Sequence, residues 1–267
     1  MRLWAWMRPF WRHRELLGQL TRREISGRYR GSVLSWSWSV ITPLMMLAVY
    51  TLVFSQIFRA SWPGASDNPL VFALNLFAGL ICFNLMAECL SQAPQLILLN
   101  QSYVTKVVFP LELLAGVRVG AAAFHAATSL LILLIFRLFA LGAVPISVLW
   151  LPLVWLPLLA LCLSCTWLLS GLGVYLRDLQ PLVQVGLNML VFLSAVFYPV
   201  SALPSALRPW LSLNPLLHVI NQTRRVCLEG LAPQWSYSLV GLPLSLLSCA
   251  VCFYLFQRLR RGFADVL

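Results

Sequence analysis

Long apolar stretches alternate with short polar or basic segments along this chain. The first stretch lies between Arg30 and Arg59, which enclose 28 uncharged residues. At about 1.5 Å of rise per residue, such a helix is long enough for the ~30 Å hydrocarbon core of a bilayer. Five similar stretches follow, so the pattern predicts six membrane-spanning helices. Their expected ranges are 33–58, 70–87, 119–136, 150–175, 182–198 and 237–256.

The segment between the fifth and sixth predicted spans is apolar, but prolines interrupt it. An α-helix loses a hydrogen bond and meets a steric clash at an internal proline. We therefore expect two short re-entrant helices that dip toward the membrane without crossing it. Asn214 should cap the second helix, with Pro215 at its first position and Gly230 at its end. The four prolines are Pro199, Pro204, Pro209 and Pro215.

The first 30 residues carry eight arginines among tryptophan, phenylalanine and leucine. This mixture predicts an amphipathic helix in the membrane interface, with its arginines toward anionic lipid, although a simple positively charged anchor fits the same pattern. With the N-terminus inside, the cytoplasmic segments would hold 14 basic residues and the opposite side 5. The positive-inside rule then places both termini in the cytoplasm.

Composition agrees with a polytopic, all-α membrane protein. Of 267 residues, 60% are hydrophobic and 10% are charged, and the mean hydropathy is +0.84. A secretory signal would have an apolar region of only about 7–15 residues, so we expect the first span to be retained. The net charge of +11 belongs to segments that flank the membrane, and nucleic acid is not an expected partner. We expect one domain over 1–267, with an interface segment at 1–32, a six-span core at 33–256 and a tail at 257–267.

Two ionisable residues fall within or beside the predicted spans. Glu88 comes about 27 Å after the start of the second span, so an interfacial carboxylate is favoured over an intramembrane proton carrier. His125 lies inside the third span, where an ionisable group is a candidate functional residue. A hydrogen bond from His125 to a neighbouring helix is the favoured alternative.

No motif of a catalytic, metal or nucleotide site occurs. A Walker A motif needs a lysine before serine or threonine after a glycine-rich loop, whereas Lys106 precedes Val107. The pairs Cys162/Cys165 and Cys249/Cys252 lie in apolar runs, which favours packing between helices over metal or redox chemistry. We expect no catalytic residue, no metal and no cofactor in this chain.

Four fragments resemble the permease subunits of bacterial ABC-2 polysaccharide exporters, most closely the Wzm-type O-antigen permeases. Their order and spacing around six apolar stretches cover nearly the whole chain. The family commonly has glycine at Ser35, aspartate at Glu24 and proline at Ala195, and these departures bear on substrate detail. The fragments are LTRREISGRYRGSVLSWSWSVITPLMMLAVYTLVFSQIF, NQSYVTKVVFPLELL, YLRDLQPLVQVGLNMLVFLSAVFYP and LSLNPLLHVINQTRR.

The resemblance implies a short cytoplasmic helix, at about Asn100–Phe109, that docks a separate ABC ATPase. An apolar helix face could enter a groove on that partner, whereas a plain loop is the alternative. The residues implied for docking are Asn100, Tyr103, Val104, Val107 and Phe109. An interface helix is implied at about Glu15–Tyr29, where Arg22, Arg23, Arg28, Tyr29 and Arg30 would meet the ATPase, lipid phosphate and the channel entrance. Pro199, Pro204, Asn214 and Pro215 would belong to periplasmic gate helices.

The implied substrate is a long glycan on a polyprenyl diphosphate lipid. Tyr50, Phe54 and Phe58 recur on one helical face and would line a glycan channel together with Trp36 and Trp38. Lipid contact or an interfacial aromatic belt explains the same residues. Arginines at the entrance would bind the diphosphate, because guanidinium groups match phosphate oxygens.

The sequence thus predicts a homodimeric permease in the bacterial inner membrane, paired with two ATPase subunits that hold ATP and Mg²⁺. One alternative keeps the class but changes the cargo to capsule, a teichoic-type polymer or a small hydrophobic molecule. The other alternative is an intramembrane glycan or lipid transferase, for which His125, Glu88 and Asp178 are the candidate catalytic residues.

Overall fold

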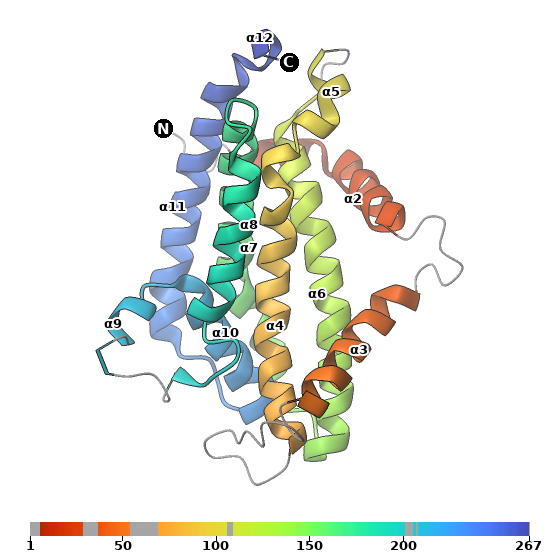
Figure 1. Cartoon of the computed structure of the whole chain (residues 1–267), viewed down its shortest axis with the longest axis vertical. Helices are drawn as coiled ribbons and strands as arrows, with labels where there is room; N and C mark the ends of the chain where they lie inside the picture. The colour runs from red at the N-terminus through yellow and green to blue at the C-terminus, as the bar shows by residue number, and fades with distance from the viewer. Residues whose placement is uncertain are drawn as a thin grey trace.

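The computed structural model describes residues 6–28, 37–53, 69–105, 109–200, 205–206 and 208–266. Within these ranges the fold is an all-helical bundle without strands (Figure 1). Short 3₁₀ turns occur at Ala93–Gln95, Leu98–Asn100 and Ile146–Trp150. The α-helices are α1 (Met7–Arg12), α2 (Arg14–Arg28), α3 (Trp38–Thr51), α4 (Pro69–Ser91), α5 (Gln101–Thr105), α6 (Glu112–Leu141), α7 (Leu151–Gly173), α8 (Leu179–Leu193), α9 (Arg208–Leu211), α10 (Pro215–Arg224), α11 (Trp235–Arg260) and α12 (Phe263–Val266).

Helix α4 forms the centre of the bundle (Figure 1). All side chains from Phe72 to Cys82 are buried, because α3, α6, α7, α8 and α10 pack around this helix. A helix that is apolar on every side must be enclosed in this way or face lipid. The second large packing surface joins α7 to α11.

Four segments are long and apolar enough to cross a membrane, namely Leu70–Gln95, Glu112–Leu141, Ile146–Gly173 and Trp235–Arg260. They confirm the second, third, fourth and sixth predicted spans, and the chain is a multi-pass membrane protein. Helices α3 and α8 are apolar but have only 14 and 15 residues, fewer than the ~20 that a spanning helix needs. The six-span prediction is therefore confirmed for four helices. Both ends of the first predicted span lie outside the described residues.

The fifth predicted span was placed too far along the chain. We expected a helix over 182–198, but α8 begins at Leu179 and ends at Leu193. The reason is Ala195, whose φ of 52° lies in the left-handed region, where an L residue cannot continue an α-helix. The chain therefore turns at Ala195 and leads away from α8.

The proline-rich segment contains the two expected short helices, α9 and α10. The Asn214 side chain accepts a hydrogen bond from the Leu216 amide at 3.0 Å, and Pro215 is the first residue of α10. A π-helical turn at Arg225–Glu229 extends α10 and ends at Gly230, whose φ is 73°. The predicted cap, first position and end of this helix are thus confirmed, because each depends on local chemistry.

Arg224 fixes α10 to the middle of the bundle. Its side chain is 3% exposed and donates to the carbonyls of Asn75 at 2.9 Å, Ala195 at 3.0 Å and Val196 at 2.7 Å. Gly79 leaves room for it, since a Cβ there would lie 2.8 Å from Arg224 Nη2. Burial lowers the pKa of the guanidinium to about 10, so it remains charged at neutral pH.

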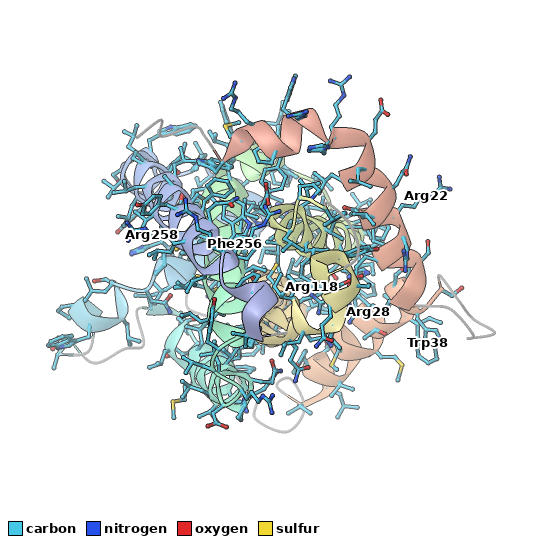
Figure 2. All side chains as sticks on the ribbon, turned by 90° about the horizontal axis from the view of Figure 1, so that it is seen from above. Arg22, Arg28, Trp38, Arg118, Phe256 and Arg258 are labelled. Atoms are coloured by element: carbon cyan, nitrogen blue, oxygen red, sulfur yellow. The ribbon has the colours of Figure 1, made fainter. Side chains whose placement is uncertain are left out.

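The predicted interface segment consists of two helices, α1 and α2, which curve along one edge of the bundle (Figure 2). Its apolar side packs against protein, since the rings of Trp6 and Phe10 lie 6.3 and 5.8 Å from that of Trp167. The predicted tail is also packed, because Phe263 on α12 is fully buried beside Phe256.

Candidate functional site

A cleft of about 820 Å³ opens beside α4 and is bordered by α2, α3, α6 and α8. Its wall combines apolar side chains with aromatic rings, hydroxyls, amides and charges. Such a mixture suits a ligand that has both polar and apolar surfaces. The polar and aromatic lining residues are Glu24, Arg28, Trp38, Ser39, Thr42, Tyr50, Phe77, Phe83, Asn84, Glu88, Ser91, Gln92, Arg118, His125, Ser129, Gln184 and Asn188.

Two glycines of α6 set how closely the N-terminal helices approach the cleft. A Cβ on Gly116 would collide with the ring of Phe10 on α1. A Cβ on Gly120 would lie 3.1 Å from Thr21 Cγ2 on α2. Glycines spaced by four residues lie on the same helix face, and small residues at this spacing let helices pack closely. This close packing brings the end of α2 to the cleft.

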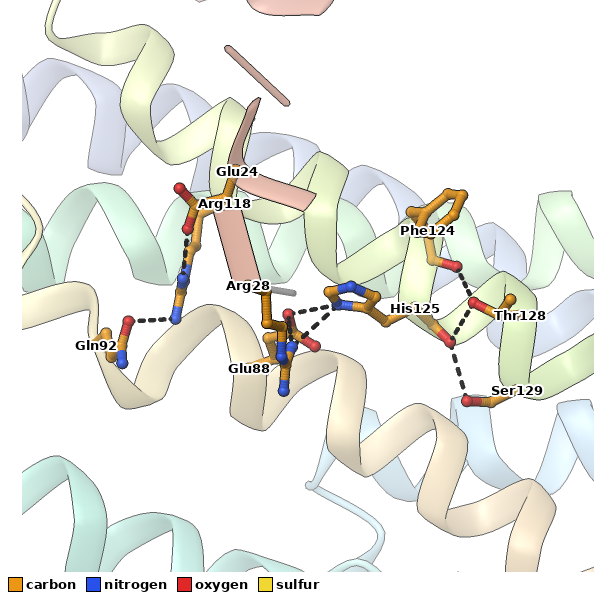
Figure 3. Close-up of polar contacts among 9 residues, drawn as sticks. All are labelled: Glu24, Arg28, Glu88, Gln92, Arg118, Phe124, His125, Thr128 and Ser129. Atoms are coloured by element: carbon orange, nitrogen blue, oxygen red, sulfur yellow. Dashed lines mark hydrogen bonds and ion pairs between the residues drawn. The ribbon is translucent and has the colours of Figure 1, made fainter. Parts of the chain in front are cut away.

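Three ionisable side chains meet at the wall of the cleft between α2, α4 and α6 (Figure 3). Arg28 Nη1 lies 2.6 Å from Glu88 Oε1, and His125 Nδ1 lies 2.7 Å from the same oxygen. Arg28 Nη1 and His125 Nδ1 are themselves 3.1 Å apart. The expected hydrogen bond from His125 to a neighbouring helix is therefore confirmed, with Glu88 as its partner.

A second set of polar contacts lies about one helical turn away along α2 and α4 and about two turns away along α6. Arg118 on α6 donates to Glu24 Oε1 on α2 at 2.8 Å and to Gln92 Oε1 at 2.7 Å, at the end of α4 (Figure 3). The two sets join the same three segments of chain, so α2 is fastened to the bundle by two ion pairs on one side of the cleft.

Two of the five predicted channel aromatics, Trp38 and Tyr50, line the cleft. Both belong to α3, and Trp38 is exposed whereas Tyr50 is partly buried. The other three, Trp36, Phe54 and Phe58, lie outside the described residues. The predicted stripe of Tyr50, Phe54 and Phe58 is thus represented by its first member alone.

The predicted docking segment contains α5, although 106–108, including Val107, are outside the described residues. The rings of Tyr103 and Phe109 stack at 4.5 Å, and Phe109 is buried. Asn100 donates to the Leu96 carbonyl at 2.8 Å, whereas Val104 lies within α5. The ring of Tyr103 is therefore partly exposed, and its other face stacks on the buried ring of Phe109.

The predicted interface arginines separate into two groups. Arg22 and Arg23 are exposed on α2, and Figure 2 shows Arg22 directed away from the bundle. Arg28 instead reaches the cleft. Tyr29 and Arg30 lie outside the described residues, as does Pro204 among the predicted gate residues. Pro199 follows the turn after α8.

The cysteines take part in helix packing, as expected. Cys249 on α11 donates to the Ala160 carbonyl of α7 at 3.0 Å, and Cys162 on α7 is fully buried. Asp178, a candidate for transferase chemistry, is exposed in the turn before α8 and does not line the cleft with Glu88 and His125.

Two arginines of the predicted charge count are buried. Arg137 and Arg224 were counted on the side opposite the N-terminus, and they are 8% and 3% exposed. Arg137 donates to the Leu228 carbonyl at 3.2 Å. Both side chains therefore take part in packing inside the bundle. The remaining polar residues of the cleft, such as Asn84 and Gln92, have no sequence spacing that would have identified them.

Comparison with known proteins gives consistent results. Residues 15–228 match the family described as ABC-2 type transporter. The chain is 28% identical to an O-antigen export system permease protein RfbA from Myxococcus xanthus, covering 97% of this chain and 98% of that protein. It is 24% identical to an RfbA from Klebsiella pneumoniae, over 95% of both chains. It is 25% identical to the polysialic acid transport protein KpsM of Escherichia coli, over 78% of this chain and 79% of that protein.

The family match covers most of the chain and includes α2, the cleft and α10. Its helices supply the membrane-crossing segments that a permease requires. This chain belongs to the ABC-2 type transporter family.

Proposed function

We propose that this chain moves a lipid-linked polysaccharide of the O-antigen type across the bacterial inner membrane. The observation that carries the proposal is the cleft beside α4, which places Trp38 and Tyr50 among hydroxyl and amide side chains. Sugars present many hydroxyls and flat apolar faces, which such walls complement. Relatives named for O-antigen export match along their whole length.

The working unit in this proposal is a homodimer with two copies of a separate ABC ATPase, which bind ATP and Mg²⁺. Both termini face the cytoplasm. Helices α5 and α12 lie at the same end of the bundle in Figure 1, which supports a common cytoplasmic face. The partly exposed ring of Tyr103 would enter a groove on the ATPase, and ATP-driven closure of the ATPase pair would move α5.

The arginines of α2 would meet the diphosphate of the lipid at the entrance of the cleft. Exposed Arg22 and Arg23 are available to lipid phosphate, whereas Arg28 faces the cleft itself. At the other end of the path, α9 and α10 would form the periplasmic gate and would lie in the membrane without crossing it.

Capsule polysaccharide is the alternative cargo favoured by a specific observation, the similarity to a polysialic acid transport protein. A teichoic-type polymer or a small hydrophobic molecule would use the same architecture. An intramembrane transferase would instead require Glu88 or His125 for chemistry, and these residues contact each other in the cleft.

Deleting the gene in its own bacterium tests the proposal. We expect long glycan to disappear from the cell surface and lipid-linked glycan to accumulate inside, with both restored by the wild-type gene. Electrophoresis of surface and intracellular glycan measures both quantities. Unchanged surface glycan in the deletion strain would rule out export as the function.

Substitutions in the cleft refine this test. Trp38→Ala and Tyr50→Ala remove aromatic faces from the cleft and should each lower surface glycan several-fold at equal protein levels. Trp11→Ala is the matched control, because Trp11 is 76% exposed and does not line the cleft. Equal loss of export in all three variants would contradict a specific role for the cleft.

A further inference from the structure

Arg28, Glu88 and His125 form a triangle in which every pair of polar atoms is within 3.1 Å. An imidazole nitrogen either donates one hydrogen bond or accepts one, depending on its proton. If Nδ1 of His125 carries a proton, it donates to Glu88 and cannot accept from Arg28. If Nδ1 lacks a proton, it can accept from Arg28 or from a protonated Glu88, but not from both. In either protonation state, therefore, at most two of the three contacts in the triangle can be hydrogen bonds at the same time.

Arg28 is the member that can leave at the lowest cost. Its side chain is 55% exposed, whereas those of Glu88 and His125 are 19% and 14% exposed. It is the last residue of α2, a helix with a single buried residue, Ile25. When Arg28 leaves, His125 can still donate to Glu88, so the carboxylate retains a partner inside the bundle.

Arg118 differs from Arg28 in both respects. Its side chain is 14% exposed, and it is held from two sides by Glu24 and Gln92. Both arginines line the same cleft. Among the described residues, the arginines of the cleft are therefore one fixed cation and one cation whose internal partner is replaceable.

We propose that Arg28 exchanges Glu88 for an oxyanionic group of the molecule that enters the cleft, while Glu88 remains on His125. The proposal rests on the proposed function, because it concerns the entry of the transported glycolipid. Carboxylate and phosphate oxygens bind a guanidinium group with the same geometry. Glu88 thus occupies the position of the ligand anion and competes with it for Arg28.

Competition between Glu88 and the ligand for Arg28 predicts in which direction each substitution changes the binding affinity. Purified full-length chain in phosphatidylcholine nanodiscs would be titrated calorimetrically with geranyl diphosphate as the probe. Glu88→Gln removes the competing charge and should tighten binding about three- to tenfold. Arg28→Gln should weaken binding several-fold, and the double variant should behave like Arg28→Gln. A purely structural role of Glu88 would give no tightening.

Glu15→Gln is the matched control, since Glu15 lies exposed in the first turn of the same helix and its loss changes the net charge equally. It should bind the probe as the wild type does. If Glu88→Gln does not fold, His125→Phe tests the proposal in the opposite direction. Without His125, Glu88 depends on Arg28 alone, and probe binding should weaken.

Nanodiscs with added phosphatidylglycerol identify the source of the anion. If phospholipid headgroups occupy Arg28, this lipid should weaken probe binding to Glu88→Gln but not to Arg28→Gln. If only the glycolipid diphosphate fits, both variants should be insensitive to the lipid. Either pattern supports the exchange.

Equal or weaker binding by folded Glu88→Gln, or equal tightening by Glu15→Gln, would overturn the exchange. The exchange would also be overturned if the probe binds neither the wild type nor Glu88→Gln in nanodiscs with or without phosphatidylglycerol. If the probe fails to bind but deletion of the gene still removes glycan from the cell surface, the exchange is wrong and the proposed export function is retained. Normal exchange with unchanged surface glycan after gene deletion would overturn export alone.

Discussion

Arg224 illustrates how a single charged side chain can hold a membrane bundle together. Three carbonyl groups from two segments of chain converge on its guanidinium group, which is almost completely buried. A planar guanidinium presents five donors in fixed directions, so it joins carbonyls that a lysine could not reach together. Removing one partner from such a cluster leaves buried polar groups unsatisfied, which costs more than the bond itself contributes.

We therefore expect Arg224→Met to destabilise the fold by about 2–4 kcal/mol. Arg224→Lys should recover only part of this loss, because one ammonium group cannot serve all three carbonyls. Thermal unfolding of the purified chain in detergent measures the effect. Arg225→Met is the control, since Arg225 donates to a single carbonyl, that of Ala232. Similar melting temperatures for Arg224→Met and Arg225→Met would contradict the anchoring role.

Residue roles were predictable where their causes are local. Asn214, Pro215 and Gly230 were placed correctly because a helix cap depends on a few adjacent residues. The anchoring role of Arg224 was not predicted, because its partners lie 28, 29 and 149 residues away. Glu88 and His125 were singled out individually, but their contact depends on how α4 packs against α6.

At the scale of elements, α2 depends on the surface that α6 offers. Gly116 and Gly120 receive Phe10 and Thr21, and the ion pairs of Arg28 and Arg118 add directional contacts. Ile25 is the one buried residue of α2, and Leu16 and Leu20 are partly buried against the core. The attachment of α2 therefore depends on side-chain volume on α6 as well as on these apolar contacts.

Gly116→Val should displace α1 and α2 from α6, because its Cβ and methyl groups need the space that Phe10 occupies. Hydrogen exchange over residues 7–28 should become much faster than in the wild type. Gly18→Ala is the control, since nothing lies within 4 Å of a Cβ there, and alanine favours the helix by about 0.5–1 kcal/mol. Unchanged exchange in Gly116→Val would show that α1 and α2 do not depend on this packing.

The apolar pattern predicted the length of a helix only where no backbone turn ends the helix within the apolar stretch. Each of the four confirmed spans contains a strongly apolar window of 18 residues. Helix α8 ends early because Ala195 turns the chain. Alanine, unlike glycine, does not indicate a left-handed conformation in a sequence. The interface segment was predicted to be amphipathic, but the contact of Trp6 and Phe10 with Trp167 was not predictable, since amphipathicity does not identify the surface that covers a helix.

At the scale of the whole molecule, the predicted docking segment is connected to α11. Arg260 on α11 donates to Glu112 at 2.8 Å and to the Phe109 carbonyl at 3.2 Å. Phe109 in turn supports the ring of Tyr103. A displacement of α5 by a partner would therefore reach the start of α6 and the end of α11 together. The cleft itself was not predictable, because five segments distant in sequence border it.

We expect Tyr103→Arg to abolish co-purification of the ATPase and to reduce surface glycan. A charged side chain at this position removes the apolar ring that would enter the partner's groove. Tyr103→Phe keeps the ring stacked on Phe109 and should behave as the wild type. Co-purification by affinity tag on the ATPase measures the result. Retention of the ATPase by Tyr103→Arg would place the docking surface elsewhere.

The turn at Ala195 limits which parts of this chain can be exchanged with relatives. Proline has a φ fixed near −65°, whereas Ala195 has a φ of 52°. A relative with proline must therefore direct its carbonyls differently at this corner, and Arg224 would lose two of its acceptors. Chimaeric permeases should consequently keep residues 193–196 and α10 from the same parent, because these pieces form one transferable unit.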